Sequence, residues 1–339
     1  MIQTIAKTNM PVDEVLRIRK NRIQPDYHPV LSASKQAGQP TTEHAEHESQ
    51  TLSDCSPSCS RRISIVTGIH GDELEGQFVC YEVARRIKEH PEYLKGTVDL
   101  YPALNPFGID SVTRGIPAFD LDMNRIFPGS SDGDMNEYLA SEIIRDLEGS
   151  DLCLDIHASN IYLTEIPQIR INELHEEALL PLAMLSNVDF IWVHGTSTVL
   201  ESTLAYSLNS RGVPTLVVEM GVGMRITREY GTQLTDGIFR LMAKLGVWIG
   251  PVAEIRTPVI SRDPDEVSFL NEPVSGIFIK TRPHGSMLKA GDEIGQIVDP
   301  LHGTLLSVIT APVDGWLFTV REYPVVDEGS LLARILTQN

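Results

Sequence analysis

The stretch "VTGIHGDELEG", Val66–Gly76, carries a histidine and several carboxylates that a simple turn between a strand and a helix does not need. It follows the β-branched and apolar run Ile63–Thr67 and precedes Gln77–Lys88, in which apolar residues recur at helical spacing. This pattern predicts that His70 and Glu73 lie at the end of a strand and the start of a helix. The carboxyl ends of strands in an open α/β sheet are the usual place for a ligand.

The acidic residues of this stretch also have a purely structural explanation. Asp72, Glu73 and Glu75 all favour the positive end of a helix dipole. A histidine at a strand end, such as His70, is often a hydrogen-bonded structural residue. The choice between a ligand site and a stabilised helix start therefore depends on the rest of the chain.

Strands and helices alternate from about Arg62 to Gly250, which predicts an α/β domain over residues 62–250, with a mainly parallel mixed sheet flanked by helices. The expected strands are Ile63–Thr67, Thr97–Pro102, Asp151–Ile156, Pro167–Ile171, Phe190–Val193 and Thr215–Glu219. The expected helices are Asp72–Glu89, Asn136–Leu147, Glu173–Leu185, Thr198–Ser210 and Arg228–Leu245. After a linker near Gly250–Pro264, short strands punctuated by Gly, Pro and Asp predict a small all-β domain over residues 265–339.

The composition is that of a soluble globular protein, with 42% hydrophobic and 22% charged residues among 339. Lys and Arg total 28 against 46 Asp and Glu, and the net charge of −18 would repel nucleic acids and anionic membranes. The start, Met1–Lys7, lacks a signal-peptide pattern, and no apolar run approaches the roughly 18 residues of a membrane span. We therefore expect that the protein binds neither nucleic acid nor membranes and that it is cytoplasmic. Cys80 and Cys153 lie within apolar patterns, as reduced core cysteines do.

Residues 1–61 form an N-terminal segment whose part 32–60 is polar and has no apolar periodicity. This composition predicts a mobile surface loop. The loop contains His44, His47, Cys55 and Cys59, which could form a small zinc site. The alternative is a loop without metal, because the Cys-x-x-x-Cys spacing is loose and no packed scaffold surrounds it.

A second histidine follows a strand of the same kind. In "LCLDIHASN" the apolar run Leu152–Ile156 ends at His157, which with His70 and Glu73 gives two imidazoles and a carboxylate. This is the ligand set of a catalytic zinc site that keeps a fourth position open for water. Asp155 lies on the same side of the strand as His157 and is a candidate partner for its imidazole. The combination favours the metal interpretation over the structural one.

A third strand, "PTLVVEMGVG", delivers Glu219 into apolar surroundings. Burial raises the pKa of a carboxyl group towards the range that is useful in general acid–base catalysis. The alternative is a salt-bridged carboxylate without chemistry. A zinc-dependent hydrolase needs one base, and Glu219 is where the sheet can supply it.

Between the two histidines lies "NPFGIDSVTRGIPAFDLDMNRIFPG", Asn105–Gly129, which is too rich in Gly, Pro, Asp and Asn for regular structure. Long ordered loops of this type are usually functional. Arg114 and Arg125 bring positive charge and Asn124 brings an amide, so the loop can bind a carboxylate and polarise a carbonyl oxygen. Surface salt bridging is the alternative for each of them.

The motifs "GIHGDELEG", "TRG" before "DLDMNRIFPG", "LDIHAS" and "VVEMG" together resemble the succinylglutamate desuccinylase/aspartoacylase family of zinc carboxypeptidase-like hydrolases. The resemblance implies an α/β sheet domain carrying one zinc ion per chain, held by His70, Glu73 and His157. It implies that Glu219 is the acid–base and that Arg114 polarises the scissile carbonyl. It also implies that Asn124 and Arg125 bind a carboxylate of the substrate. Arg170, in the segment after His157, is a further candidate for binding a substrate carboxylate.

The β domain is similar to a biotinyl or lipoyl carrier in its segments "KAGDEIGQIVD" and "ITAPVDGWL". The turn between them, Leu301–Thr304, has no lysine to hold a prosthetic group, which argues against a carrier. We expect the domain to shape the mouth of the active site or to form a contact between copies in a homo-oligomer.

The predicted function is hydrolysis of the amide bond of an N-acylated amino acid or a related small amide, with zinc as cofactor. A metallocarboxypeptidase acting on peptide C-termini uses the same metal set and is the nearest alternative. A non-catalytic binding module on the same fold is a third possibility, which the presence of Glu219 disfavours because a binder needs no acid–base residue.

Overall fold

The computed structural model describes residues 1–10, 12–25, 61–117, 119–195 and 201–337. The predicted polar loop 32–60, with its candidate zinc ligands, lies outside these ranges. The helices are α1 (Glu75–Glu89), α2 (Pro106–Ser111), α3 (Met135–Leu147), α4 (Glu176–Ala183), α5 (Leu204–Asn209) and α6 (Arg228–Lys244), with short 3-10 turns at η2 (Pro91–Tyr93), η3 (Met123–Arg125), η4 (Glu173–His175) and η6 (Pro264–Glu266). The strands of the first 261 residues are β1 (Ile2–Asn9), β2 (Val15–Ile23), β3 (Arg62–Thr67), β4 (Thr97–Tyr101), β5 (Leu152–His157), β6 (Leu163–Asn172), β7 (Phe190–His194), β8 (Thr215–Gly221) and β9 (Val259–Ser261). Those that follow are β10 (Val267–Asn271), β11 (Gly276–Lys280), β12 (Met287–Leu288), β13 (Glu293–Asp299), β14 (Thr304–Thr310), β15 (Gly315–Arg321), β16 (Val325–Val326) and β17 (Leu331–Thr337).

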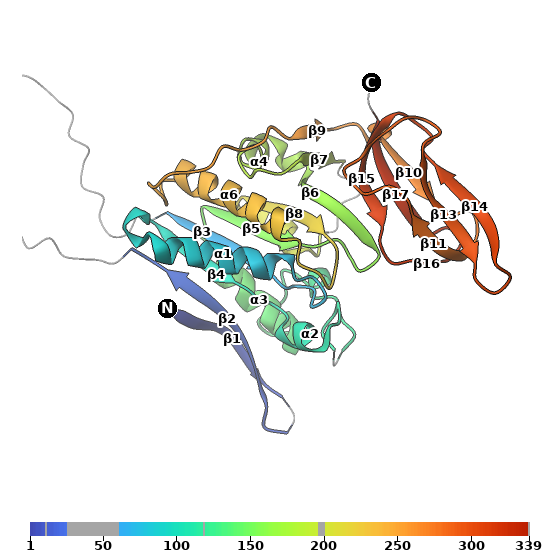
Figure 1. Ribbon diagram of the computed structural model, residues 1–339. Coiled ribbons are helices and arrows are strands. Elements are labelled where there is room, and N and C mark those ends of the chain that lie inside the picture. The colour runs from blue at the N-terminus through green and yellow to red at the C-terminus, as the bar shows by residue number, and fades with distance from the viewer. Residues whose placement is uncertain (11, 26–60, 118, 196–200, 338–339) are drawn as a thin grey trace, which may run out of the picture.

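The centre of the molecule is a mixed sheet whose middle strands are parallel (Figure 1). Strand β3 pairs in parallel with β4 and β5, and β5 pairs in parallel with β8. Strand β6 then joins β8 in the antiparallel direction. The carboxyl ends of β3, β5 and β8 therefore meet at one edge, as the alternating sequence pattern predicts.

Helices cover both faces of this sheet. On one face, α1, α4 and α6 share one apolar core with residues of β3 and β5 such as Ile65 and Leu154, and Figure 1 shows α1 and α6 side by side. On the other face, α3 and α5 pack with Val66 and Cys153. Because neighbouring residues of a strand point to opposite faces, His157 and Asp155 share the face of Cys153. The sheet thus presents polar side chains at its carboxyl edge while its middle remains apolar.

The N-terminal residues form an antiparallel hairpin that the sequence analysis did not predict. Strand β1 pairs with β2, and β2 pairs antiparallel with β4, so the hairpin extends the central sheet. Lys20 of β2 is buried, and its ammonium contacts the carboxylates of Asp99 and Asp146. The hairpin is therefore held by charges as well as by backbone hydrogen bonds.

The C-terminal strands continue the same sheet. Strand β15 pairs antiparallel with β6, and β17 and β10 follow it, as the right-hand side of Figure 1 shows. A second sheet of order β14-β13-β11-β16 packs with them around its own apolar core. Phe190, Trp192 and Phe318 form a further core where the α/β strands meet the C-terminal strands. The division at residues 250–265 into two domains stays a prediction, but the two regions share one continuous sheet.

Most predicted elements lie within a few residues of the observed ones, and three predictions were wrong in detail. The helix predicted over Thr198–Ser210 begins only at Leu204, where the Thr203 side chain caps it, and the predicted residues 198–200 lie outside the described ranges. The first helix begins at Glu75, so Glu73 belongs to the turn before α1 and not to its first turn. The stretch Asn105–Gly129 is not wholly irregular, because Pro106 and the side chain of Asn105 start the short helix α2. Cys80 and Cys153 are buried free thiols, as expected. In the described ranges no helix combines the length and the apolar character that crossing a membrane requires.

Candidate active site

The candidate site is built at the carboxyl edge of the parallel strands. His70 follows the end of β3, and His157 is the last residue of β5. The turn between β3 and α1 carries Glu73 back towards His157. Side chains from two separate motifs thus meet at one point. Glu73 and His157 are 84 positions apart in the sequence.

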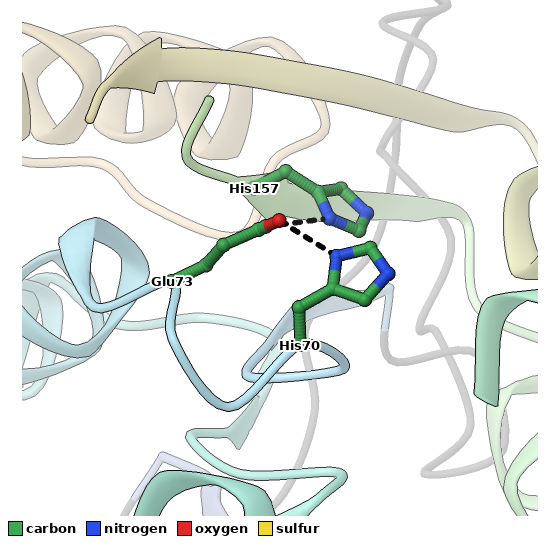
Figure 2. Close-up of side chains that lie close together, drawn as sticks. All are labelled: His70, Glu73 and His157. Atoms are coloured by element: carbon green, nitrogen blue, oxygen red, sulfur yellow. Dashed lines mark hydrogen bonds and ion pairs between the residues drawn. The ribbon is translucent and has the colours of Figure 1, made fainter. Parts of the chain in front are cut away.

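Glu73 lies between the two imidazoles, and all three side chains are buried (Figure 2). The Nδ1 atom of His70 is 2.7 Å from Glu73 Oε1, and the Nδ1 atom of His157 is 3.0 Å from Glu73 Oε2. One nitrogen or oxygen from each residue lies within 4.8 Å of the others. The group could hold a metal ion.

The outer nitrogens of both imidazoles face further carboxylates. His70 Nε2 is 3.1 Å from Asp122 Oδ1, and His157 Nε2 is 3.2 Å from Asp155 Oδ1. When each Nε2 carries a proton that faces its carboxylate, the lone pair of each Nδ1 points towards Glu73. Two imidazole lone pairs and a carboxylate then converge, which is stable only with a cation or protons among them. This donor set fits a divalent metal such as zinc.

The electrostatics of the centre favour bound positive charge. Burial alone would raise the pKa of Glu73, but hydrogen bonds with His157 and His70 outweigh it and hold that pKa below its usual range. Burial alone would lower the pKa of His157, yet Asp155 and Glu73 raise it well above its usual value. The pKa of His70 is raised in the same way, by Asp122 and Glu73 against burial. The surrounding carboxylates thus stabilise a cation at this point, whether a proton or a metal ion.

A cavity of about 310 Å³ opens onto this centre. Every residue that the sequence analysis assigned to the site lines it: His70, Glu73, Arg114, Asn124, Arg125, His157, Arg170 and Glu219. The structure therefore brings all eight candidates together, although they come from four separate motifs and the segment after His157. Their individual roles stay predictions.

Glu219 sits beside the His157 end of the cavity. The strand continues past it to Gly221, two residues further than predicted, and its register pairs Glu219 with His157 of β5. Burial raises the pKa of the Glu219 carboxyl, and the guanidinium of Arg170, 3.5 Å away, opposes this shift. A carboxyl group whose pKa is raised in this way suits proton transfer.

The loop after α2 contributes two arginines and an amide to the wall of the cavity. Arg114 Nη1 donates to Glu73 Oε1 at 3.1 Å, and its Nη2 donates to Asp122 Oδ2 at 3.3 Å. The Oδ1 atom of Asn124 accepts from the Leu204 amide at 2.9 Å, which fixes the side chain at the cavity wall. The side chains of Arg114 and Arg125 are 41% and 43% exposed, so both can still contact a ligand.

Sequence reasoning missed two charged residues of the cavity wall, Glu165 of β6 and Arg334 of β17. Glu165 is 1% exposed, accepts hydrogen bonds from Arg170 at 3.1 and 3.2 Å, and is ion-paired with Arg334. The available signal was a charged residue within a strand, in the largely apolar β17 for Arg334 and in the partly polar β6 for Glu165. The sequence alone could not show that these two strands meet through β15.

Comparison with known proteins places this geometry among amide hydrolases. Residues 59–245 match the family model of the succinylglutamate desuccinylase/aspartoacylase catalytic domain. A curated relative, the N-alpha-acetyl-L-2,4-diaminobutyric acid deacetylase of Halomonas elongata, is 26% identical over 275 residues, which cover 79% of this chain and 80% of the relative.

Two solved structures have the same fold at lower identity. The succinylglutamate desuccinylase/aspartoacylase of Rhodobacter sphaeroides has a TM-score of 0.75 and 22% identity, and the match covers 100% of this chain and 96% of that one. The product-bound ectoine utilization protein EutE (DoeB) of Ruegeria pomeroyi has a TM-score of 0.70 and 19% identity, with coverage of 82% and 86%. At these identities the likeness establishes the fold.

Proposed function

Because the chain belongs to the succinylglutamate desuccinylase/aspartoacylase family, we propose that it is a zinc-dependent deacylase that hydrolyses the amide bond of an N-acylated amino acid. The observation that carries this proposal is the single cavity that gathers His70, Glu73 and His157 with Glu219 and several arginines. The relative from Halomonas elongata, named as a deacetylase of an N-acetylated amino acid, supports the same reaction class.

The metal would be held by Nδ1 of His70, Nδ1 of His157 and the carboxylate of Glu73, with Asp122 and Asp155 orienting the two imidazoles. A zinc ion bound there supplies a Lewis acid that lowers the pKa of water and polarises the amide carbonyl. Proton transfer, stabilisation of the carbonyl oxygen and substrate binding are assigned to the side chains described next.

Glu219 is the proposed acid–base. Its carboxylate takes a proton from the attacking water, whose oxygen adds to the amide carbonyl carbon. The carbon–nitrogen bond then breaks, and Glu219 returns the proton to the leaving nitrogen, so that a carboxylic acid and an amine are released. The raised pKa of Glu219 makes its carboxylate a stronger base for the first half of this transfer.

Arg114 and the Asn124–Arg125 pair act on the substrate. The guanidinium of Arg114, 3.1 Å from a Glu73 oxygen, is close enough to the centre to stabilise negative charge developing on the carbonyl oxygen. Arg125 and the amide of Asn124 bind a substrate carboxylate, and Arg170 binds on the Glu219 side. A cavity of about 310 Å³ is at the lower end of the range for small-molecule sites, which favours a small amide over a peptide.

The test is a deacylation screen with purified, zinc-loaded protein. N-acetyl and N-succinyl amino acids, N-alpha-acetyl-L-2,4-diaminobutyrate among them, are offered beside dipeptides and longer peptides. We expect release of free amine from at least one N-acyl amino acid, with no release by the Glu219→Gln variant. Cleavage of peptides in preference to all acylated amino acids would make the protein a carboxypeptidase. Tight binding of these amides without turnover would make it a binding module.

A further inference from the structure

The second sheet of the C-terminal region has one face that packs and one that does not. Phe278 of β11, Ile297 of β13 and Ile309 of β14 belong to the apolar core of that region. Because neighbouring residues of a strand point to opposite faces, the residues beside them point outwards. The outer face defined in this way carries six aliphatic side chains: Ile277, Ile279, Val298, Leu305, Val308 and Val325.

The register of the strands joins four of these side chains into one row. Ile277 of β11 pairs with Val325 of β16 on one side and with Val298 of β13 on the other. Val298 in turn pairs with Leu305 of the edge strand β14. Paired residues point to the same side of a sheet, so this aliphatic row crosses all four strands.

A second row lies beside the first, and both are open to solvent. Gln296 of β13 pairs with Ile279 of β11 and with Val308 of β14. Ile279 is 50% exposed and Val308 is 44% exposed, while Leu305 and Val325 at the ends of the first row are 55% and 46% exposed. No described part of the chain covers these four side chains. Figure 1 shows the sheet at the right-hand end of the molecule, away from the helices.

The outer face carries no charge, although the net charge of the chain is −18. Residues 300–313, which include all of β14, contain no Asp, Glu, Lys or Arg. Edge strands are usually protected from other chains by charged residues or by proline, and β14 has neither. Two copies of so acidic a chain repel each other, and a two-fold contact brings each charge near its own image. An uncharged aliphatic face therefore suits a second copy of the same chain.

The size of the face fits a weak and reversible dimer. Strands lie about 4.8 Å apart and rise about 3.3 Å per residue, so the four strands make a face roughly 19 Å wide and 20 Å long. Two such faces cover about 800 Å² in projection, and the accessible area of protruding side chains exceeds their projection. The contact thus reaches the low end of specific interfaces, which bury about 1,000 Å² in total. We expect a dissociation constant in the micromolar range.

We propose that the outer face of the β14-β13-β11-β16 sheet is the contact surface of a homodimer, in which the same face of a second copy packs against it about a two-fold axis. Aliphatic side chains of the two sheets then interdigitate, as they do in the core of a β-sandwich. None of the six aliphatic residues lines the candidate active-site cavity. The inference is therefore independent of the proposed function.

Sedimentation velocity and light scattering of the full chain at about 1–100 µM test the proposal. The mass of the wild type should rise from 37.6 kDa towards twice that value across this range. Ile279→Asp should raise the dissociation constant by at least about 100-fold, because association would bury an unpaired charge. Ile249→Asp is the matched control, because Ile249 is 62% exposed in the segment after α6 and lies outside the face. It should leave the dissociation constant unchanged.

A milder variant separates loss of the contact from loss of the fold. Ile279→Thr/Val308→Thr keeps β-branched side chains in both strands and should raise the dissociation constant by about 10-fold. It decides the question if Ile279→Asp does not fold. Because the contact is apolar and the copies repel each other, about 0.5 M NaCl should tighten the dimer.

The inference is overturned if the wild type stays monomeric at about 100 µM, or if the double variant associates as tightly as the wild type. A dimer that salt weakens, or that Ile249→Asp disrupts as strongly as Ile279→Asp, would place the contact elsewhere and overturn it as well. If deleting residues 32–60 turned a monomeric wild type into a dimer, the occupant of the face would be that polar segment of the same chain and not a second copy.

Discussion

Glu219 of β8 lies directly opposite His157 of β5, its register partner on the neighbouring parallel strand. Parallel pairing at this register sets the carboxyl group beside the candidate metal centre without making it one of the three converging ligands. The position of Glu219 relative to His157 is fixed because backbone hydrogen bonds hold the two strands in this register within the sheet. A residue held in this way can move protons while the neighbouring residue binds the metal.

The first prediction follows from that separation. Glu219→Gln keeps the size of the side chain and its hydrogen-bonding capacity but removes the base. We expect zinc content to be unchanged while kcat falls by roughly 10²–10⁴-fold, the usual contribution of a positioned acid–base. Glu229→Gln, on the exposed first turn of α6, is the matched control and should retain full turnover. Loss of zinc in Glu219→Gln would instead identify Glu219 as a ligand, and unchanged turnover would leave Asp72 or Glu75 as the next candidates for the base.

The second prediction concerns the metal itself. Elemental analysis should find about one zinc ion per chain, because three protein ligands with an open fourth position bind a single ion. Replacing His70 or His157 by Ala removes one of three ligands and should abolish this zinc. His302→Ala, whose ring is 68% exposed on the turn between β13 and β14, should not change it. Equal metal content in all four proteins would show that the site lies elsewhere.

A third prediction tests whether the N-terminal hairpin is part of the fold. Lys20 is 3% exposed, and its Nζ lies 2.7 Å from Asp146 and 3.3 Å from Asp99. Lys20→Met fills the same space but leaves two carboxylates without this cation. Removal of one partner of a buried ion pair typically costs 3–5 kcal/mol, and we expect about 3 kcal/mol because Asp146 is 27% exposed.

Urea unfolding measures this cost as a lower free energy of unfolding. The exposed Lys7 of β1 offers the control, since Lys7→Met should change that free energy by less than about 0.5 kcal/mol. A Lys20→Met protein as stable as the wild type would mean that the hairpin charges contribute nothing to the fold.

The sequence predicted the centre of the site better than its edges, for physical reasons. His70 follows an apolar strand, His157 ends one and Glu219 lies near the end of one, and parallel strands bring their carboxyl ends to one edge, so local patterns were enough to group them. Arg334 depends on the pairing of β17 with β15 and of β15 with β6, and no local pattern encodes such long-range register. Its place in the cavity could not be read from its own segment.

The N-terminal hairpin is a different case, because a signal was present. Leu16, Ile18 and Lys20 alternate with exposed polar residues along β2, which is the period of a half-buried strand. Lys20, the charged residue among these three buried ones, weakened the apolar pattern. Its burial depends on Asp99 and Asp146, which lie far away in the sequence and supply the compensating charge.

The last prediction tests how the loop that carries Arg114 is held beside the candidate metal centre. Gly71 follows His70, and its amide donates to the carbonyl oxygen of Arg114 at 3.2 Å, so the turn carrying the candidate ligand contacts the loop carrying the candidate carbonyl-polarising residue. A Cβ atom at position 71 would lie 2.0 Å from the carbonyl carbon of Gly108 in α2. Backbone cannot rotate away as a flexible side chain can, so Gly71→Ala must push the turn and α2 apart.

We expect this substitution to lower the free energy of unfolding by about 1–3 kcal/mol, as overpacking does, and to lower kcat/KM by at least about 10-fold because Arg114 moves with the loop. Ser111→Ala, at the exposed end of α2, adds no atoms and should change neither quantity. Chemical unfolding and steady-state kinetics on the substrate found in the deacylation screen measure the two effects. Gly71→Ala with wild-type stability and wild-type kcat/KM would show that the contact between the turn and α2 does not position the loop, and that Arg114 is held through Glu73 and Asp122 alone.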